Sequence, residues 1–496
     1  MKKNKFIIVI IAIALTFSVL PCKAQETVYK PTWESLDSRP IPDWFQDAKF
    51  GIFIHWGPYS VPAWSPKGTY SEWYQHWLQG KSLFGNGNFK GDEVAVHHEK
   101  TYGKDFTYYD FGKMFTADLF NPDEWAKLIE DSGAKYTVLT SKHHDGFTLW
   151  PSKEANDRGF AWNSMDVGAK RDLVGELSTA VKKTKVKMGL YYSLYEWYHP
   201  LWQNDKARFV DEHFLPQVKD LVTKYNPDVL WADGEWDMEA DKWKSKELLA
   251  WLFNESVAKD NIVINDRWGK GIRKHHGGYF TTEYETEAPE FNRPWEECRG
   301  MGFSFGYNQN EDAADYNSPK ALVLTLVNIV STGGNLLLDI GPDARGNIPV
   351  IMQERLLQIG SWLKTNGEAI YGTRLWNHSF QWSLDGEKNY KPKQHYLGSE
   401  VILKQTIDPE PGYAIKELFF TQNDEAYFVM IPQWKEDIVI RGFKAANNPK
   451  ITLLATGESL VGTQKGNDFV ISLPMYQPNK MKTSDNYAYA IKIAKI

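Results

Sequence analysis

Residues 227 to 236 read PDVLWADGEW, an apolar run that stops at the carboxylate of Asp233 and is released by Gly234. A run of this kind is typical of a strand in a parallel sheet, because helices cover both faces and the side chains need not alternate. Where such strands form a barrel, the chemistry collects at the point where each strand ends and its loop begins. Asp-Gly is also an ordinary turn dipeptide, so the rest of the chain decides whether Asp233 is functional.

Strand candidates of the same kind recur along the chain, most of them with a helical pattern between. Strands are expected at residues 48–57, 135–140, 186–193, 227–233, 262–264, 278–283, 301–307 and 335–339. Helices are expected at about residues 121–132, 172–183, 210–225, 245–258, 319–331 and 353–366. The alternation predicts a (β/α)8-like barrel over residues 25–370, imperfect because some of the later helices look short. Residues 81–112 lack periodicity and are expected to form an irregular excursion.

The remaining residues, 371–496, have a different pattern. Short alternating segments such as 401–405, 417–421, 426–431, 450–454 and 468–473 are separated by Gly, Asn, Asp and Pro. This pattern predicts an antiparallel β-sandwich domain. We expect it to pack closely on the barrel, although a glycan-binding role is an alternative.

The first 24 residues have the pattern of a signal peptide. Three lysines among the first five residues precede an apolar run over residues 6–20, and Cys22-Lys23-Ala24 is a small-residue cleavage site. The protein is therefore expected to be exported and to be periplasmic or secreted. A lipid anchor on Cys22 is an alternative, which Pro21 disfavours.

Composition narrows the class of partner. Lys and Arg number 57 against 63 Asp and Glu, a net charge of -6, with no long run of either sign. This balance indicates neither nucleic-acid binding nor a polybasic membrane contact. No later apolar run reaches the roughly 18 residues that a membrane span needs. Cys298 is the only cysteine after the leader, so no internal disulfide is expected.

Aromatic content is high, with 21 Trp, 25 Tyr and 26 Phe. Sugar rings expose C–H faces that stack on aromatic planes, so carbohydrate-handling proteins often share this composition, although much of it is ordinary core. The residues at or near the strand ends are polar, aromatic or ionisable. They are His55, His143, His144, Tyr191, Trp231, Asp233, Arg267 and Glu283. In a barrel these side chains converge on one mouth.

Two carboxylates facing each other across a sugar are what glycosidic cleavage needs. Asp233 is the expected nucleophile, and the proton donor is Glu283, Glu285, Glu287 or Glu72. A separation of about 5 to 5.5 Å between the pair would imply retention of configuration.

A metal or cofactor site is the rival interpretation. His143 and His144 would point to opposite faces if their strand continued, and no HExxH or Cys-rich spacing accompanies them. The pairs His97-His98 and His275-His276 lie in polar segments and are expected to be solvated. No GxGxxG or P-loop pattern is present. We therefore expect neither a metal nor a cofactor.

The sequence resembles the α-L-fucosidases of glycoside hydrolase family 29. The matching stretches, in the family's order, are residues 49–57, 72–74, 142–147, 190–193, 230–234, 265–269, 282–284 and 303–307. The resemblance implies retaining hydrolysis of terminal α-L-fucose from glycans, on a barrel followed by a β-sandwich, without a metal. It indicates neither a linkage nor an oligomeric state.

Roles carry over position by position. Asp233 matches the family's nucleophile, and Glu283 matches the acid/base of those members that take it from this segment. Fucose-binding positions are matched by His55, Glu72, Trp73, His143, His144, Tyr191, Trp231 and Arg267, and the patch that holds the sugar's methyl group by Phe53, Tyr70 and Phe305. The His, Glu and Trp N–H groups are expected to fix the hydroxyls. Two alternatives to the fucosidase activity are a retaining glycosidase for a related galacto-configured sugar and a fucose-binding, lectin-like protein on an inactive barrel.

Overall fold

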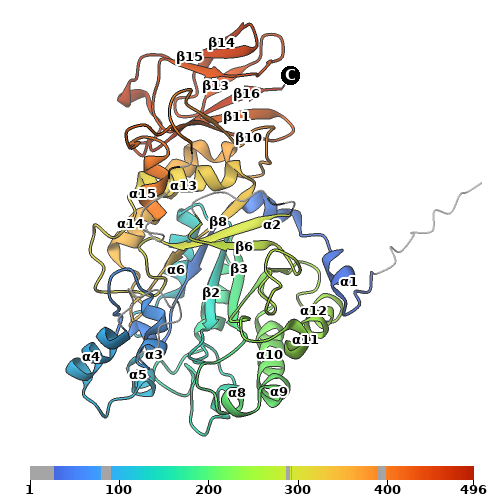
Figure 1. Ribbon diagram of the computed structural model, residues 1–496, viewed down its shortest axis with the longest axis vertical. Helices are drawn as coiled ribbons and strands as arrows, with labels where there is room; N and C mark the ends of the chain where they lie inside the picture. Colours follow the sequence, from blue (N-terminus) through green and yellow to red (C-terminus); the bar gives the residue numbers. More distant parts are fainter. Residues whose placement is uncertain are drawn as a thin grey trace, which may run out of the picture.

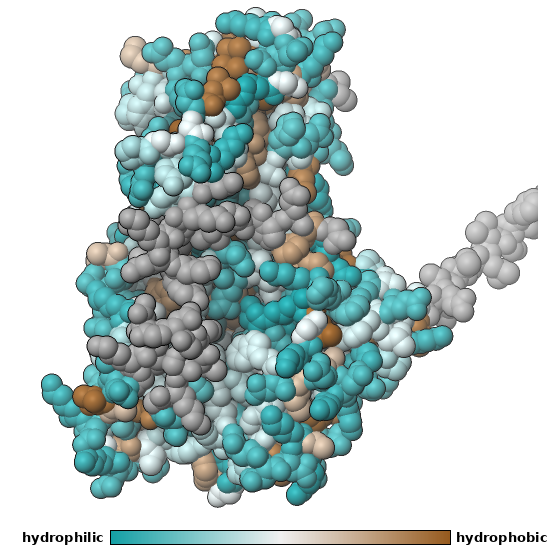
Figure 2. All heavy atoms as spheres, viewed as in Figure 1, coloured by the Kyte–Doolittle hydropathy of each residue, from teal (hydrophilic) through white to brown (hydrophobic). Residues whose placement is uncertain are grey.

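The computed structural model describes residues 27–79, 91–285, 291, 293–388, 390 and 398–495. The expected leader with Cys22, the carboxylate of Glu287 and the first part of the 81–112 excursion lie outside the described residues. Figure 1 shows two bodies: a barrel of strands ringed by helices, and a β-domain stacked on one side of it. In Figure 2 this face is mostly hydrophilic, with a narrow hydrophobic streak on the C-terminal domain.

Eight parallel strands form the first body. They are β1 (Phe50–Ile54), β2 (Tyr136–Lys142), β3 (Lys187–Ser193), β4 (Val229–Asp233), β5 (Val263–Ile264), β6 (Phe280–Glu283), β7 (Trp295–Gly300) and β8 (Gly334–Ile340). Their order is β5-β4-β3-β2-β1-β8-β7-β6. This is the predicted (β/α)8-like barrel, imperfect at the seam between β5 and β6.

Two backbone hydrogen bonds close this seam. The N–H of Gly278 donates to the carbonyl of Asn265 (3.0 Å) and the N–H of Tyr279 to that of Ile264 (3.1 Å). A Cβ on Gly278 would lie 1.6 Å from the carbonyl oxygen of Ile264. Only glycine therefore lets the chain entering β6 come this close to β5.

Helices surround the barrel. The longer ones are α6 (Pro122–Asp131), α7 (Leu173–Val181), α10 (Leu215–Tyr225), α12 (Ser245–Asn254), α13 (Pro319–Ser331) and α14 (Val350–Asn366), with a π-helical turn η5 (Phe209–Phe214) before α10. Shorter elements are α1 (Trp33–Asp37), α2 (Asp43–Ala48), η1 (Pro58–Ser60), η2 (Ser71–Trp73), α3 (Tyr74–Trp77), η4 (Glu154–Asn156), α8 (Pro200–Asn204), α9 (Lys206–Arg208), α11 (Ala240–Trp243) and η6 (Gly367–Ala369). Local sequence starts α6, because Asn121 accepts the N–H of Glu124 (3.3 Å) and Pro122 occupies the first turn.

Two predictions for this body were wrong. The seventh strand is 295–300, not 301–307, because its polar residues Glu296, Glu297 and Arg299 are buried among partners inside the protein and hide the apolar pattern of a strand. The described part of the 81–112 excursion is largely helical: α4 (Gly91–Tyr102), η3 (Tyr108–Asp110) and α5 (Phe111–Met114). In α4, Val94 and His98 lie four residues apart and are both buried.

The second body is an antiparallel sheet with its own core. Its strands are β9 (Phe380–Trp382), β10 (Lys416–Gln422), β11 (Ala426–Ile431), β12 (Asp437–Ile440), β13 (Ile451–Leu453), β14 (Ser459–Lys465), β15 (Asp468–Ser472) and β16 (Tyr489–Ala494), in the order β12-β15-β14-β13-β16-β11-β10-β9. The turn η7 (Pro478–Lys480) precedes β16, while the helix α15 (Gly398–Lys404) lies beside α13 between the two bodies (Figure 1). The prediction of a β segment at 401–405 was wrong, because the residues buried there, 401, 402, 405 and 406, share one face of a helical turn.

Buried polar contacts tie the two bodies together. Lys416 of β10 donates to Asn328 of α13 (2.8 Å), and the indole of Trp362 in α14 donates to the carbonyl of Ala488 (2.8 Å). The second body therefore packs against the barrel's helices. Across the described ranges, no helix is both long and apolar enough to cross a bilayer.

Candidate active site

Alternation along the barrel strands sets the direction of each candidate side chain. In β4, Val229 and Trp231 lie in the cluster inside the barrel, while Leu230 and Ala232 pack outward against the helices. With a period of two, Asp233 continues the inward row at the strand's end. The same alternation turns Phe53 inward on β1.

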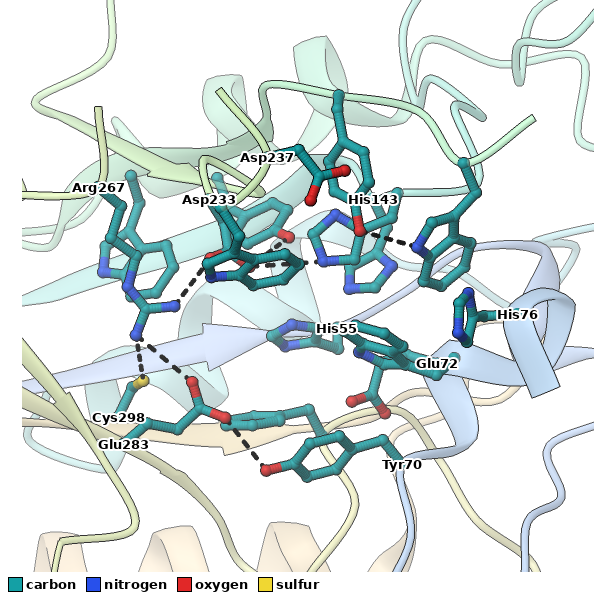
Figure 3. A pocket seen from close by; sticks show the side chains of 18 of the residues that line it. His55, Tyr70, Glu72, His76, His143, Asp233, Asp237, Arg267, Glu283 and Cys298 are labelled. Atoms are coloured by element: carbon teal, nitrogen blue, oxygen red, sulfur yellow. Dashed lines mark hydrogen bonds and ion pairs between the residues drawn. The ribbon is translucent and has the colours of Figure 1, made fainter. Parts of the chain in front are cut away.

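The inward side chains meet in one cavity of about 590 Å³, shown in Figure 3. Every described residue predicted to contact the substrate lines it: Phe53, His55, Tyr70, Glu72, Trp73, His143, His144, Tyr191, Trp231, Asp233, Arg267, Glu283 and Phe305. Among the described residues, none beyond Phe305 does. The described part of the C-terminal domain thus contributes nothing to this wall.

Asp233 is buried and surrounded by donors. Arg267 Nη1 lies 2.8 Å from Oδ1, the hydroxyl of Tyr191 donates to Oδ2 (3.0 Å), and Arg273 Nη2 lies 3.5 Å from Oδ1. Burial acts to raise the pKa of Asp233, but the nearby cations, Arg267 foremost, outweigh it and hold the pKa well below its ordinary range. Asp233 is therefore a carboxylate, as a nucleophile must be.

Glu283 lies across the cavity from Asp233 and shares a partner with it (Figure 3). Its Oε2 is 3.4 Å from Nη2 of Arg267, and its Oε1 accepts from the hydroxyl of Tyr70 (3.1 Å). The side chain is 31% exposed. One guanidinium thus bridges the two predicted catalytic carboxyls, and Glu283 is the one that solvent can reach.

Glu72 is the second carboxyl able to hold a proton here. Its Oε2 accepts from the N–H of Gly306 (2.9 Å) and the hydroxyl of Ser304 (3.2 Å). Burial raises its pKa to about 7. Glu285, by contrast, is exposed and does not line the cavity.

The histidines are neutral hydrogen-bonding groups. Burial lowers the pKa of His143 to about 3 and those of His55 and His144 well below their ordinary value. Ser193 donates its proton to the carbonyl of Tyr195 (2.8 Å), so Nδ1 of His144 donates to Ser193 (2.6 Å) and its Nε2 is left as an acceptor.

The strand does not continue through His143 and His144, because β2 ends at Lys142, and both rings enter the cavity with their centres 4.2 Å apart. The expectation that His98 is solvated was wrong. His98 is buried on α4, bonded to the hydroxyl of Tyr74 (3.1 Å) and the carbonyl of Phe106 (2.8 Å). Its neighbour His97 stacks on Trp64 at 3.9 Å.

The other histidine pair, His275-His276, is only partly solvated. His275 is exposed as expected, while His276 is half-buried and bonded to Asp37 (2.8 Å).

The apolar side of the cavity is aromatic. Phe305 lies 6.4 Å from Phe53 and 5.6 Å from Tyr70, ring centre to ring centre. Trp231 offers a ring face only, because its N–H already donates to the buried Glu296 (2.8 Å). The expectation that indole N–H groups hold substrate hydroxyls is therefore wrong for Trp231.

Several residues around the cavity were missed from the sequence. Asp339, on β8, bonds Nδ1 of His55 (2.6 Å), and its position at a strand end was the available signal. Glu235 and Trp236 follow Asp233 after one glycine. Arg273 lies in a polar loop after β5, and no pattern marks it.

A metal-like cluster lies outside this cavity. Asp157, His199 and His213 bring potential ligand atoms within 4.8 Å of one another. His213 is already held between Asp157 (3.0 Å) and Glu196 (2.7 Å), and His199 accepts the N–H of Leu201 while meeting Asp157 at 2.7 Å. Lys142 also pairs with Glu196 (2.9 Å). The cluster is thus a network of charges in which each histidine nitrogen has a partner.

Comparison with known proteins points to one family. The family model described as Alpha-L-fucosidase matches residues 17–368. An alpha-L-fucosidase of Dictyostelium discoideum is 45% identical over 383 residues, covering 74% of this chain and 79% of that protein. Tissue alpha-L-fucosidase of Homo sapiens is 40% identical over 480 residues, covering 94% and 92%. The crystal structure of Thermotoga maritima alpha-fucosidase with a mechanism-based inhibitor has a TM-score of 0.74 at 35% identity, covering 94% of this chain and 99% of that one.

Proposed function

Because the chain belongs to the alpha-L-fucosidase family, we propose that it is a retaining exo-α-L-fucosidase that removes terminal fucose from glycans by double displacement. The observation that carries this proposal is the pair of carboxyls, Asp233 and Glu283, on either side of Arg267 in one cavity. A fucose-binding protein without activity would need neither a nucleophile nor a proton donor.

In the first step, an oxygen of Asp233 attacks the anomeric carbon while Glu283 gives its proton to the glycosidic oxygen. The C–O bond to the leaving sugar breaks, and a fucosyl ester on Asp233 forms with inverted configuration. In the second step, Glu283 takes a proton from water, the water oxygen attacks the anomeric carbon, and the ester bond breaks. Two inversions give net retention.

The surroundings of Asp233 suit this role. Tyr191 and Arg267 fix the carboxylate by two charge-assisted hydrogen bonds, so little reorganisation is needed at the moment of attack. The position of Glu283 on the exposed side lets water reach it in the second step.

Selection for fucose follows from the apolar side of the cavity, where Tyr70 also donates to Glu283. Phe53, Tyr70 and Phe305 offer an apolar surface for the methyl group, where a hydroxymethyl group would lose a hydrogen bond. One methyl discriminates weakly, so the hydroxyl contacts of the neutral histidines and Glu72 supply most of the selectivity. This apolar surface disfavours galactose, which carries a hydroxymethyl group on C5 where fucose carries a methyl group.

The test is the configuration of the first product. Hydrolysis of an aryl α-L-fucoside, followed by proton NMR before mutarotation, should show α-fucose first. β-Fucose as the first product would overturn the double displacement, and an inactive protein would overturn the activity. Asp233→Gly rescued by azide should give the inverted fucosyl azide, which identifies the nucleophile.

We further propose that residues 1–24 direct export to the periplasm or beyond the cell, from the charge and apolar pattern of that segment. Mass spectrometry of the mature protein from the native host should find a chain beginning at Gln25. An uncleaved chain in the cytoplasm would contradict the proposal.

A further inference from the structure

The cavity is larger than the group of residues that match fucose-binding positions. Its remaining wall consists of residues from α3, the loop after β3, the turn after β4 and the loop after β5. These are His76, Tyr195, Trp197, Tyr198, Trp202, Gln203, Trp236, Asp237 and Arg273, and Cys298 of β7 completes the wall. Apart from Arg273, whose charge acts on Asp233, these residues have no role in the two chemical steps.

The side chains at the mouth of the cavity are more exposed to solvent than those deeper inside. Most residues that match fucose positions are buried, whereas Trp236 is 36% exposed and Arg273 is 31% exposed in its side chain. Asp237 is exposed as well and points into the cavity in Figure 3. An enzyme that removes a terminal sugar binds that sugar inside the cavity, and the rest of the bound glycan extends out through the mouth. The mouth is thus where the next sugar must lie.

Trp236 offers a ring face at this position. Tyr195 meets it edge-on (centroids 5.8 Å apart), and His144 and Trp73, both matched to fucose-binding positions, lie 5.4 and 5.9 Å away. Such a partly exposed aromatic plane, supported from behind, is suited to stacking against the C–H face of a sugar.

The support behind Trp236 is rigid. The buried indole of Trp197 donates to the hydroxyl of Tyr195 (2.9 Å), and Tyr195 packs on the buried Trp202 at 5.4 Å. Little side-chain entropy remains to be lost when a ligand arrives.

Arg273 supplies the polar part of the same mouth. Its Nε donates to Glu235, a carboxylate that is 2% exposed and whose Oε2 has no partner among the described residues. A buried carboxylate without a cation is costly, so Glu235 fixes the guanidinium in place. Nη2 of Arg273 lies 3.5 Å from Asp233. Arg273 lines the cavity, and the N–H groups that neither Glu235 nor Asp233 uses suit sugar hydroxyl or ring oxygens.

From these contacts we propose that Trp236 and Arg273 form a second sugar-binding subsite, for the sugar that carries the fucose. The inference rests on the proposed function. Trp236 stacks on the ring of that sugar, and Arg273 donates to its oxygens. Because the turn that positions Asp233 also carries Trp236, the two subsites keep a fixed spacing.

The test compares two substrates. Fucosyl fluoride has no leaving sugar, whereas a fucosyl disaccharide, chosen as the one that the wild type cleaves best, needs the second subsite. Trp236→Ala should lower kcat/KM for the disaccharide at least about tenfold more than for the fluoride, since tenfold corresponds to 1.4 kcal/mol of lost contact. Trp236→Phe, which keeps an aromatic plane, should recover part of the difference. Arg273→Ala should raise KM for the disaccharide more than it lowers kcat.

Tyr476→Ala is the matched control, since Tyr476 is 39% exposed but belongs to the C-terminal domain. It should lower neither rate. Equal losses on both substrates for Trp236→Ala would overturn the second subsite and leave the fucosidase activity standing. A wild type inactive on both substrates would overturn the proposed function and the subsite with it. If Trp236→Ala does not fold, Trp236→Phe and Arg273→Ala decide by the same ratio.

Discussion

Replacing Arg267 by glutamine should move the acid side of the pH profile. Arg267 holds Asp233 at 2.8 Å and is the foremost of the cations that keep its pKa low against burial. Removing one partner of a buried ion pair costs about 3 to 5 kcal/mol. At 1.36 kcal/mol per unit, this corresponds to a rise of about two to four units in the pKa of Asp233.

The sign follows from the proposed role of Asp233. A nucleophile must be ionised, so activity is lost as the pH falls through its pKa. The wild type, with a depressed pKa, should keep kcat/KM down to the lowest pH at which it stays folded. Arg267→Gln should lose it at a pH several units higher.

The assay is kcat/KM for an activated aryl fucoside between pH 3 and 8, with circular dichroism at each pH. Arg273→Gln is the matched control, because Arg273 lies 3.5 Å from the same carboxylate and is paired with Glu235. It should shift the acid limb by less than the Arg267 variant. An unmoved limb in Arg267→Gln would refute the electrostatic reasoning.

Three other changes test separate parts of the molecule. Glu283→Ala should lower kcat/KM about 10²- to 10⁴-fold on a fucoside with a poor leaving group and far less on an activated one. Glu72→Gln should lower kcat/KM on the two fucosides by the same factor. If instead the loss depends on the leaving group in the Glu72 variant and not in the Glu283 variant, the acid is Glu72. Gly278→Ala should cost about 3 kcal/mol or more of stability, seen as a lower urea midpoint, because the new Cβ meets the carbonyl of Ile264; an unchanged midpoint would show that the seam can yield. Burial alone would lower the pKa of His213, but Glu196 and Asp157 raise it. The stabilising charge of His213 is therefore present at low pH and lost as the pH rises through the raised pKa. Unfolding free energies measured between pH 6 and 9 should fall with pH in the wild type and more weakly in His213→Gln.

The barrel and most of its wall could be predicted because both follow from local pattern. An apolar run that ends in a polar residue marks a strand end, and a barrel brings such ends together whatever their separation in sequence. Asp233, His55 and Glu283 were found this way. The prediction failed where polar residues are buried by partners far along the chain: β7 carries Glu296, whose partners Tyr136 and Trp231 lie on other strands.

Loop residues escaped prediction for a related reason. Arg273 lines the cavity because the end of β4 and the turn after it bring Asp233 and Glu235 to it. His98 sits in a polar segment and was expected to be solvated, yet Tyr74 and the carbonyl of Phe106 use both of its ring nitrogens inside the protein. Such contacts depend on how separate segments fold together, and no spacing in the sequence announces them.

The shared guanidinium of Arg267 has a consequence for the whole catalytic cycle. The proposed double displacement begins with the negative charge on Asp233 and needs a proton on Glu283. In the ester intermediate of that mechanism the charge would have passed to Glu283, and Asp233 would be neutral. Since Arg267 lies 2.8 Å from one carboxyl and 3.4 Å from the other, the sum of charges around it is the same in both states. One anion moves between two fixed positions beside one cation, and the buried site never has to hold an unbalanced charge.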